Sequence, residues 1–297
     1  MKKTSIVLLS SLLLLTACAS QSKPTSTSSS SSQSSAKVSL SAEEEKELKT
    51  ATSDYKTFVE ENISQLLTDT ENFRDLLKDG KLEEAKKVYP LIRMNYERSE
   101  PLAESFSELD QKIDFRLVDY VDEHSKDKNP EEGWSGFHKI ERILWEENTT
   151  KGTESYADQL VNDVKELKAK VSTIDVTPEL MLTGAVDLLN EVATSKITGE
   201  EEVYSHTDLY DFRANIQGAE KIYQLFKPLI EKKDAKLAET LDSEFANVNA
   251  LLDKYMVDGE NYKSYTDLTK EDTKTLAEAV TKLGEPLSNM GKILGED

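Results

Sequence analysis

The chain has 297 residues, a formal net charge of −20 at pH 7 and one cysteine. This acidity argues against binding to nucleic acid or to anionic lipid headgroups, because both repel a negative surface. The cysteine is Cys18, close to the N-terminus, so disulfides, cysteine-rich zinc sites, iron–sulfur clusters and thiol catalysis are excluded from the domain that follows. Small cations are the natural ligands of such a chain.

Residues 1–17 predict a lipoprotein signal peptide. Lys2 and Lys3 form a short cationic start, and residues 6–17 are mostly apolar. This apolar stretch is shorter than the roughly 20 residues that a membrane-spanning helix needs. The small residues before Cys18 in Leu15-Thr16-Ala17-Cys18 resemble the lipobox of bacterial lipoproteins. We therefore expect a lipid on Cys18, an extracytoplasmic location, and no membrane attachment other than this lipid.

Residues 18–41 predict a flexible linker. They are nearly all Ser, Thr, Gln and Lys, and they include an unbroken serine run at 28–32. Such a composition has too little apolar surface to fold. We expect a disordered tether between the lipidated Cys18 and a folded domain at 42–297.

The rest of the chain predicts an all-α fold, because apolar residues recur at spacings of three and four and no alternating strand pattern is visible. Pro90 and Pro101 lie in a helical stretch and should kink or divide it. The number of helices exceeds one four-helix bundle, so two packed bundles, or one elongated bundle with extra helices, are the expected architectures. The expected helices cover 43–79, 81–106, 112–124, 132–147, 153–172, 177–195, 208–232, 234–256 and 269–292.

His138 and Glu141 are the first candidate metal ligands. They are three residues apart in a predicted helix and so project from the same face. An imidazole nitrogen and a carboxylate in this arrangement can converge on one ion. Taken alone, the pair is more typical of a structural or surface histidine.

Glu97, Glu100 and Asp114 are candidates to complete the site. Glu97 and Glu100 share a helix face, and with His138 and Glu141 these acids would form a set of oxygen ligands with one nitrogen. Such a set suits ferric or ferrous iron, or manganese. Each acid is, on its own, also typical of a solvated helix face.

Asp208, Asp211 and Asn215 form a third candidate group, because their spacing places them on one helical face. They are candidates for additional ligands, for hydrogen bonds that support the ligands, or for a helix N-cap at Thr207 or Asp208. Capping and support of the ligands are the favoured roles.

Three segments together resemble EfeO/EfeM-type proteins of the imelysin-like family. They are Gly136-Phe137-His138-x-x-Glu141, Tyr96-Glu97-x-x-Glu100-Pro101 and Thr207-Asp208-Leu209-Tyr210-Asp211-Phe212-x-Ala214-Asn215-x-x-Gly218. The resemblance implies two helical bundles and an iron-binding component of an Efe-type uptake system, not an enzyme. It implies as partners an iron permease and a haem-containing peroxidase-like protein. His138, Glu141, Glu97, Glu100 and Asp114 match the family's metal positions.

Two departures from the family pattern shape the alternatives. The tether leads directly into helices, so the chain resembles the short EfeM form without a cupredoxin-like domain. Arg142 follows Glu141, so the inverted zinc-protease motif His-x-x-Glu-His is not met. A zinc-dependent metallopeptidase and a metal-bridged binder of acidic polysaccharide remain the alternative functions, and zinc, copper and manganese remain alternative metals.

Overall fold

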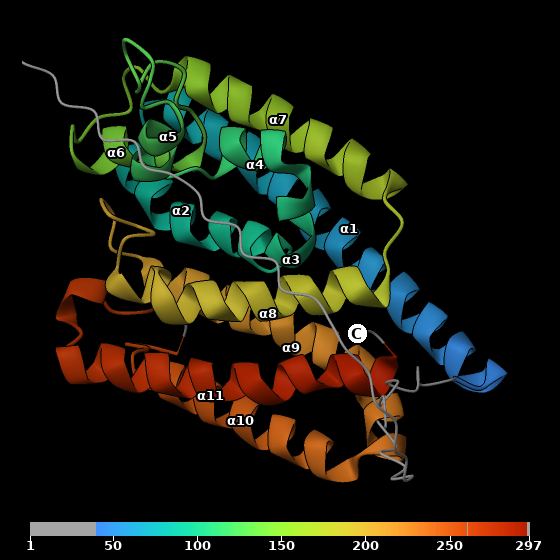
Figure 1. Cartoon of the computed structure of the whole chain (residues 1–297). Coiled ribbons are helices and arrows are strands. Elements are labelled where there is room, and N and C mark those ends of the chain that lie inside the picture. Colours follow the sequence, from blue (N-terminus) through green and yellow to red (C-terminus); the bar gives the residue numbers. More distant parts are fainter. Residues whose placement is uncertain (1–39, 260, 296–297) are drawn as a thin grey trace, which may run out of the picture. The chain divides into compact units, whose positions relative to one another are not determined.

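The computed structural model describes residues 40–259 and 261–295, and within these ranges the fold is all-α (Figure 1). These ranges contain no β-strand, although an isolated antiparallel bridge joins Met256 to Tyr262. None of the helices in them is long and apolar enough to cross a membrane. The predicted signal peptide, Cys18 and nearly all of the predicted linker lie outside the described residues.

The first bundle is built around the long helix α1. It begins at a capping box in which Ser41 and Glu44 satisfy each other's backbone amides. The buried residues of α1 recur every three or four positions from Leu48 to Leu77, so one stripe of the helix faces the core along its whole length. This stripe packs on α2 and α7, and α6 closes the bundle. The bounds are α1 (Ala42–Lys78), α2 (Leu82–Glu97), α6 (Phe137–Trp145) and α7 (Glu154–Thr173).

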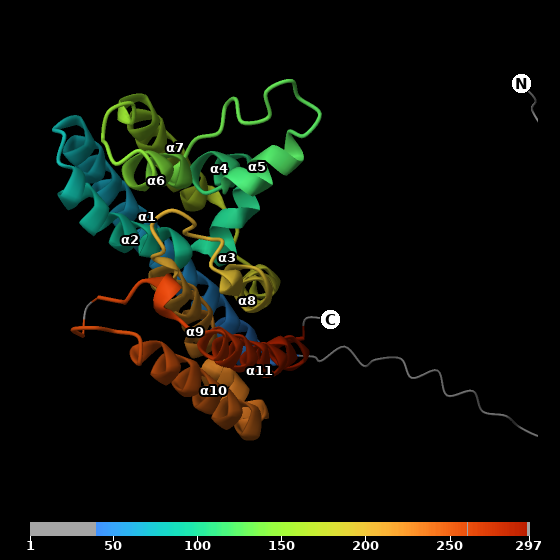
Figure 2. The ribbon, with the colours of Figure 1, turned by 90° about the vertical axis from the view of Figure 1, so that its left-hand side faces the viewer.

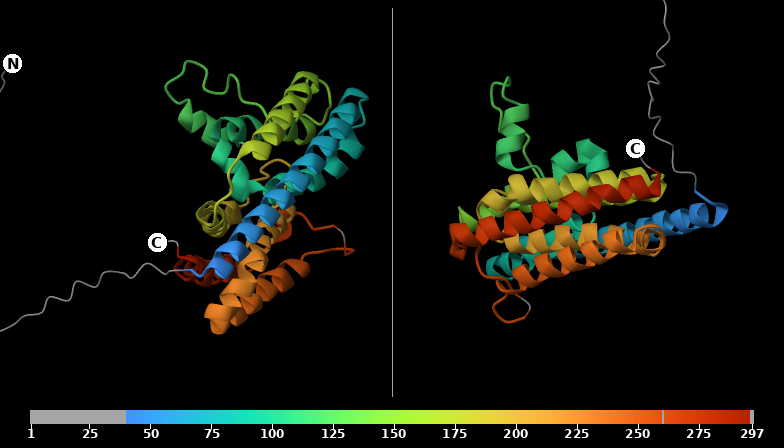
Figure 3. Two further views of the ribbon diagram at one scale, coloured as in Figure 1. Left: turned by 90° about the vertical axis from the view of Figure 1, so that its right-hand side faces the viewer. Right: turned by 60° about the horizontal axis from the view of Figure 1, so that its bottom comes forward.

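The second bundle consists of four helices that lie side by side (Figure 3). They are α8 (Pro178–Thr194), α9 (Asp208–Lys233), α10 (Ala235–Asp253) and α11 (Lys270–Leu294). Helix α9 also packs against α1 and α2, and α8 packs against the short α3 (Glu100–Ala103), so one hydrophobic core runs through both bundles. The predicted fold class of two packed helical bundles is confirmed.

The predicted helix at 81–106 is divided, as Pro101 suggested. Helix α2 continues through Pro90 to Glu97, the chain turns at Arg98 and Ser99, and α3 starts with Pro101 in its first turn, where a missing N–H is tolerated. Gly218 of α9 explains why this turn lies deep in the fold. A β-carbon at Gly218 would lie 2.7 Å from the carbonyl oxygen of Arg98, so only glycine allows this approach.

The predicted helices at 112–124 and 132–147 have the wrong bounds. The first is replaced by α4 (Ser107–Ile113) and α5 (Leu117–Glu123), which meet at Asp114 and the residues after it. The second begins only at Phe137, because Gly136 has φ +88°, a conformation that cannot continue a right-handed helix. The residues between α5 and α6 form a loop that extends away from the helices (Figure 2).

Candidate metal site

A cluster of charged side chains is buried where the two bundles meet. It combines residues of α2, α3, α6 and α9 with residues that precede or follow helices. Each member is no more than 9% exposed. The members of this buried charge cluster are Arg93, Glu97, Glu100, Asp114, His138, Glu141, Lys196, Glu201, Glu202, Asp208, Asp211 and Asn215.

His138 enters the cluster from the first turn of α6. Gly136 allows this helix start to lie against the end of α4, because a β-carbon there would lie 2.3 Å from the carbonyl oxygen of Ile113. His138 Nδ1 lies 3.1 Å from Glu141 Oε2. An ionised Glu141 accepts a hydrogen bond from Nδ1–H, and in the tautomer with this N–H the lone pair of the imidazole lies on Nε2.

The Nε2 atom of His138 is the nitrogen of the cluster that could bind a metal ion through its lone pair. It is buried and has no hydrogen-bond partner among the described residues. Two carboxylate oxygens face it, Asp114 Oδ1 at 3.8 Å and Glu201 Oε1 at 4.0 Å. Ligands that share a metal ion at bond lengths of about 2.1 Å lie roughly 3 to 4 Å apart. The three side chains therefore have the spacing of a ligand set.

The loop at 199–207 carries Glu201 and Glu202 into the cluster. Its backbone N–H groups at Tyr204 and Ser205 donate to Glu141 Oε1 over 3.0 and 2.7 Å. Asp208 Oδ1 accepts from the Glu202 backbone N–H at 3.2 Å. These bonds explain how two consecutive glutamates can be held inside the protein: the carboxylates of Glu141 and Asp208 satisfy the backbone amides of the loop.

Lys196 and Asn215 bind Glu97 and Glu100. Lys196 Nζ lies 3.1 Å from Glu97 Oε2 and 2.8 Å from Glu100 Oε1. Asn215 Nδ2 donates to Glu97 Oε2 at 2.9 Å and to Glu100 Oε2 at 2.6 Å. Burial alone would raise the pKa of Glu97, but Lys196 and Arg93 more than offset it and hold this pKa below its usual range. Glu97 is thus already neutralised by fixed cations.

Arg93 is the second buried cation. Its guanidinium pairs with Glu97 and Asp114, and Nε lies 2.7 Å from Glu202 Oε1. Its carbon Cζ also lies 5.6 Å from the centre of the Phe137 ring, a cation–π distance. Burial would lower the pKa of Arg93, but the surrounding carboxylates raise it well above the usual value, so the group stays charged.

The acids of the cluster outnumber its cations. Among the described residues, eight buried carboxyl groups of the cluster face the fixed charges of Arg93 and Lys196. Burial and the charges of Glu141 and Asp211 raise the pKa of Glu202 well above its usual value, and burial raises that of Asp208 to about 7. In the metal-free protein, bound protons neutralise the carboxyl groups that have no cation, and a polyvalent cation would replace these protons.

Three sets of side chains in the described part of the chain bring possible ligand atoms within 4.8 Å of one another. We call Asp114, His138 and Glu201 the inner group, because it contains the free Nε2. A second set, His138–Glu141–Glu202, uses the Nδ1 side of the same imidazole, which Glu141 already engages. The third set, Glu100, Glu104 and Glu191, is the outer group.

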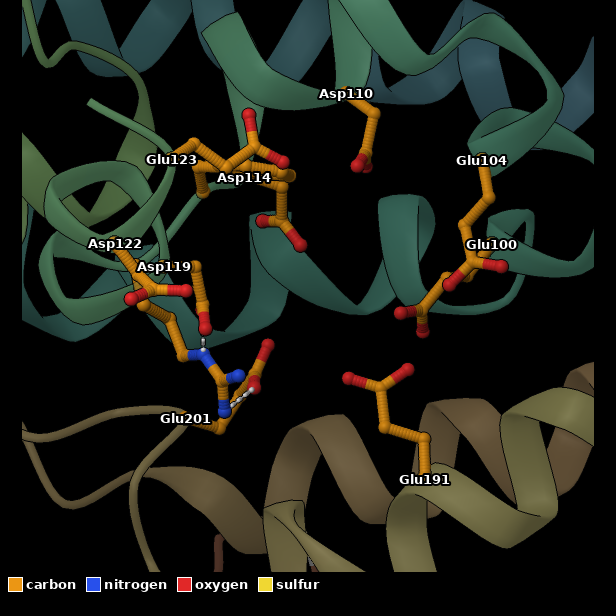
Figure 4. Close-up of a pocket in the computed structure, with 11 residues that line it drawn as sticks. Glu100, Glu104, Asp110, Asp114, Asp119, Asp122, Glu123, Glu191 and Glu201 are labelled. Atoms are coloured by element: carbon orange, nitrogen blue, oxygen red, sulfur yellow. Dashed lines mark hydrogen bonds and ion pairs between the residues drawn. The ribbon is translucent and has the colours of Figure 1, made fainter. Parts of the chain in front are cut away.

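An acidic cavity of about 380 Å³ leads to the inner group (Figure 4). Asp114 and Glu201 belong to both the cavity wall and the inner group, while Asp122 and Glu123 bring the wall to the protein surface. Such a cavity raises the local concentration of cations. Its wall consists of Glu100, Glu104, Asp110, Asp114, Phe115, Arg116, Asp119, Asp122, Glu123, Glu191 and Glu201.

The structure brings all the predicted metal-site residues into the buried charge cluster. It places Asp114 and Glu141 beside the two ring nitrogens of His138, whereas Glu97 and Glu100 pair with the ammonium of Lys196. Asp208 accepts a backbone N–H of the loop and Asn215 donates to these glutamates, whereas Thr207, a predicted N-cap of α9, makes no capping hydrogen bond with its side chain. Direct ligation of an ion by Asp208 and Asn215 stays a prediction.

Four members of the cluster were not foreseen: Arg93, Lys196, Glu201 and Glu202. Arg93 lies four residues before Glu97 in one helix, a spacing that signals an ion pair but not its burial. Glu201 and Glu202 stand beside Glu200 in a run of acids that is typical of an exposed turn. No local signal distinguishes them from surface residues, because their burial depends on Glu141, 60 residues away or more.

Comparisons with known proteins agree with this architecture. The sequence model of the imelysin family, peptidase M75, matches residues 51–290. A solved structure of an imelysin-like protein from Psychrobacter arcticum superposes with a TM-score of 0.67 over 88% of this chain and 98% of that one, at 13% sequence identity, which supports the fold alone. The chain belongs to the imelysin-like class of helical proteins.

Closer relatives narrow this class. An "Efem/EfeO family lipoprotein" of Staphylococcus haemolyticus is 50% identical over 294 residues, covering 99% of both chains. One of Staphylococcus aureus is 53% identical over 248 residues, covering 83% of this chain and 86% of its own. The chain is a member of the EfeM/EfeO lipoprotein family, which confirms the resemblance found in the sequence.

Proposed function

We propose that this protein is a lipid-anchored, extracytoplasmic iron-binding component of an Efe-type uptake system, which captures iron in the buried charge cluster and delivers it to a membrane permease. The observation that carries the proposal is the unpartnered Nε2 of His138, which faces Asp114 and Glu201 at the inner end of an acidic cavity. One nitrogen with carboxylate oxygens suits a hard or borderline ion such as iron.

Capture followed by delivery requires ligands that can release the bound ion. Carboxylates bind protons as well as metals, so a partner can displace the ion without breaking a rigid cage. Cys18 would hold the protein at the membrane through its lipid, and the tether at 18–41 would let the domain reach the permease and a haem-containing peroxidase-like partner.

A zinc peptidase is the alternative that the family's name suggests. A general base must reach a metal-bound water. Glu141 does not fit this role, because His138 engages one of its oxygens and two backbone N–H groups engage the other. The acidic cavity also argues against a binder of acidic polysaccharide unless a metal bridges the two. Binding and transfer therefore fit better than hydrolysis.

Metal titration of a soluble form tests the proposal. Residues 18–297 with Cys18→Ser, freed of metal, are titrated with ferrous iron, ferric iron and zinc by calorimetry, with His138→Ala alongside. We expect iron to bind more tightly than zinc and His138→Ala to weaken binding at least 100-fold, about 3 kcal/mol.

The matched control is His124→Ala, because His124 stacks on Tyr120 outside the cluster. Iron binding that His138→Ala leaves unchanged would disprove the assigned site. A preference for zinc together with cleavage of an unstructured protein would favour the peptidase instead.

A further inference from the structure

Lys196 places a positive charge between the inner and outer groups. Its side chain is 1% exposed, and its Nζ lies 2.8 Å from Glu100 Oε1, in the outer group. The same Nζ lies 3.5 Å from Glu201 Oε1, in the inner group. That oxygen is the one that faces His138 Nε2 at 4.0 Å. Arg93 Nη2 also lies 3.4 Å from this oxygen. Lys196 and an ion bound at His138 would therefore compete for one carboxylate oxygen that Arg93 contacts as well.

The two buried cations differ in how firmly they are held. Arg93 has a planar guanidinium, comes from the helix α2, pairs with acids on several sides and lies over the Phe137 ring. Lys196 is a single ammonium on a four-carbon stem, and it comes from the three-residue helix η2 (Lys196–Thr198). A point charge on a flexible stem can change partners without moving the backbone, whereas a guanidinium held on several sides cannot.

The cavity offers the ammonium other partners. Glu104 and Glu191 line it beside Glu100, and their carboxylate oxygens lie within 4.8 Å of one another. Figure 4 shows Glu104 and Glu191 near Glu100. An ammonium that leaves Glu201 can keep Glu100 and move towards these two acids. The exchange would keep the lysine paired, so it avoids the large cost of an isolated buried charge.

We propose that Lys196 is a built-in competitor of the captured ion. In the metal-free protein its ammonium holds Glu97, Glu100 and Glu201 together. An ion that binds the inner group takes Glu201, and the ammonium moves towards the outer group; its return to Glu201 promotes release. This inference rests on the proposed function, because it concerns the same site.

Affinity measurements on two variants test it in the soluble form defined above. Lys196→Met keeps the approximate shape of the side chain and removes its charge. Lys165→Met is the matched control, since it changes the net charge equally but affects an exposed lysine paired with Glu71. We expect Lys196→Met to bind the metal at least about tenfold more tightly, and to release it to a chelator more slowly, than Lys165→Met.

The outcomes separate this inference from the proposed function. If the parent protein binds neither iron nor zinc, the proposed function fails and this inference fails with it. If the parent binds but Lys196→Met binds equally or more weakly than Lys165→Met, only the role of Lys196 is overturned. Thermal unfolding followed by circular dichroism shows whether each variant is folded.

A measurement on the unaltered lysine covers the case in which Lys196→Met does not fold. The protein is labelled with 15N at the lysine side chains, and Lys196→Arg, which keeps the positive charge, identifies the Lys196 ammonium signal by its loss. Zinc and gallium(III), diamagnetic substitutes for ferrous and ferric iron, should shift this signal as its partners change. A signal that stays in place while the metal is bound overturns the proposal.

Discussion

The two halves of the buried charge cluster differ in what neutralises their acids. In the paired half, Glu97 and Glu100 are held by Lys196 and Asn215. The open half contains the inner group and the acids around it, Glu141, Glu202, Asp208 and Asp211. Here His138 Nε2 and Asp208 Oδ2 have no hydrogen-bond partner among the described residues. Both halves contain buried acids, so acidity alone does not locate an ion site. An unpartnered nitrogen at the inner end of an acidic cavity does.

The difference also assigns separate tasks to the two halves. In the paired half, fixed cations hold the pKa of Glu97 below its usual value, whereas burial and the charge of Glu97 raise that of Glu100 well above it. Cations and a proton together thus neutralise this pair without a metal. In the open half, burial raises the pKa values of Glu202, Asp208 and Asp211, and an arriving ion can replace the protons that these acids hold. We therefore expect substitution of the glutamates in the paired half to act mainly on stability, and substitutions in the open half to act mainly on metal affinity. Lys196 contacts both halves, so its substitution should change the affinity as well.

Arg93→Met should have the largest effect, on stability. It removes a fully buried charge that pairs with Glu97, Asp114 and Glu202, and it leaves these acids without their cation. Breaking a buried ion pair from one side costs about 3–5 kcal/mol. Urea unfolding of the metal-free protein should show a loss of this size.

Arg74→Met is the matched control, because Arg74 makes a surface pair with Asp75. Such pairs contribute about 0–1 kcal/mol. A loss for Arg93→Met no larger than that of the control would mean that the stability of the buried charge cluster does not depend on Arg93.

Glu201→Gln should have the next largest effect, on metal affinity. Glu201 faces His138 Nε2, whereas Glu97 contacts Lys196 and Asn215. Loss of a direct carboxylate ligand should weaken iron binding about 100-fold, close to 3 kcal/mol. Glu97→Gln, the matched change in the paired half, should weaken it less than tenfold. Calorimetry that shows equal losses for the two variants would contradict the division into halves.

Much of the fold could be predicted from the sequence, because helix periodicity and turn residues are local signals. The break near Pro101 follows from the missing N–H of proline. The late start of α6 could not be predicted, because the positive φ of Gly136 depends on the end of α4 lying against it. A glycine in a sequence shows that such a conformation is allowed, not that it is used.

The site could be predicted only in part, for a similar reason. His138, Glu141, Glu97 and Glu100 are recognisable by their spacing of three within helices. Lys196 and Glu201 belong to no motif, and their burial results from the packing of η2 and its loop against the first bundle. Tyr265 fixes this loop, since its hydroxyl donates to the Ile197 carbonyl at 2.7 Å and its N–H to that of His206 at 2.9 Å. Contacts between distant segments leave no local trace in the sequence.

The smallest of the three expected effects is that of Asp208 on the pH dependence of the unfolding free energy. Burial raises its pKa from 3.8 to about 7 in the folded protein. A carboxyl group whose pKa is raised on folding contributes its full stability below its unfolded pKa, and this contribution is lost as the pH rises through the folded value. The metal-free protein should therefore lose stability between about pH 5 and pH 8, on the order of 2 kcal/mol from this group.

Asp208→Asn should remove this part of the pH dependence. The amide stays neutral at every pH, and its oxygen can still accept the hydrogen bond from the Glu202 backbone N–H. Asp187→Asn is the matched control, because Asp187 is exposed on α8. Urea unfolding at pH 5, 6, 7 and 8 should give a flatter profile for Asp208→Asn than for the parent and the control. Three parallel profiles would mean that Asp208 is ionised throughout this range, so that the open half must be neutralised by other groups.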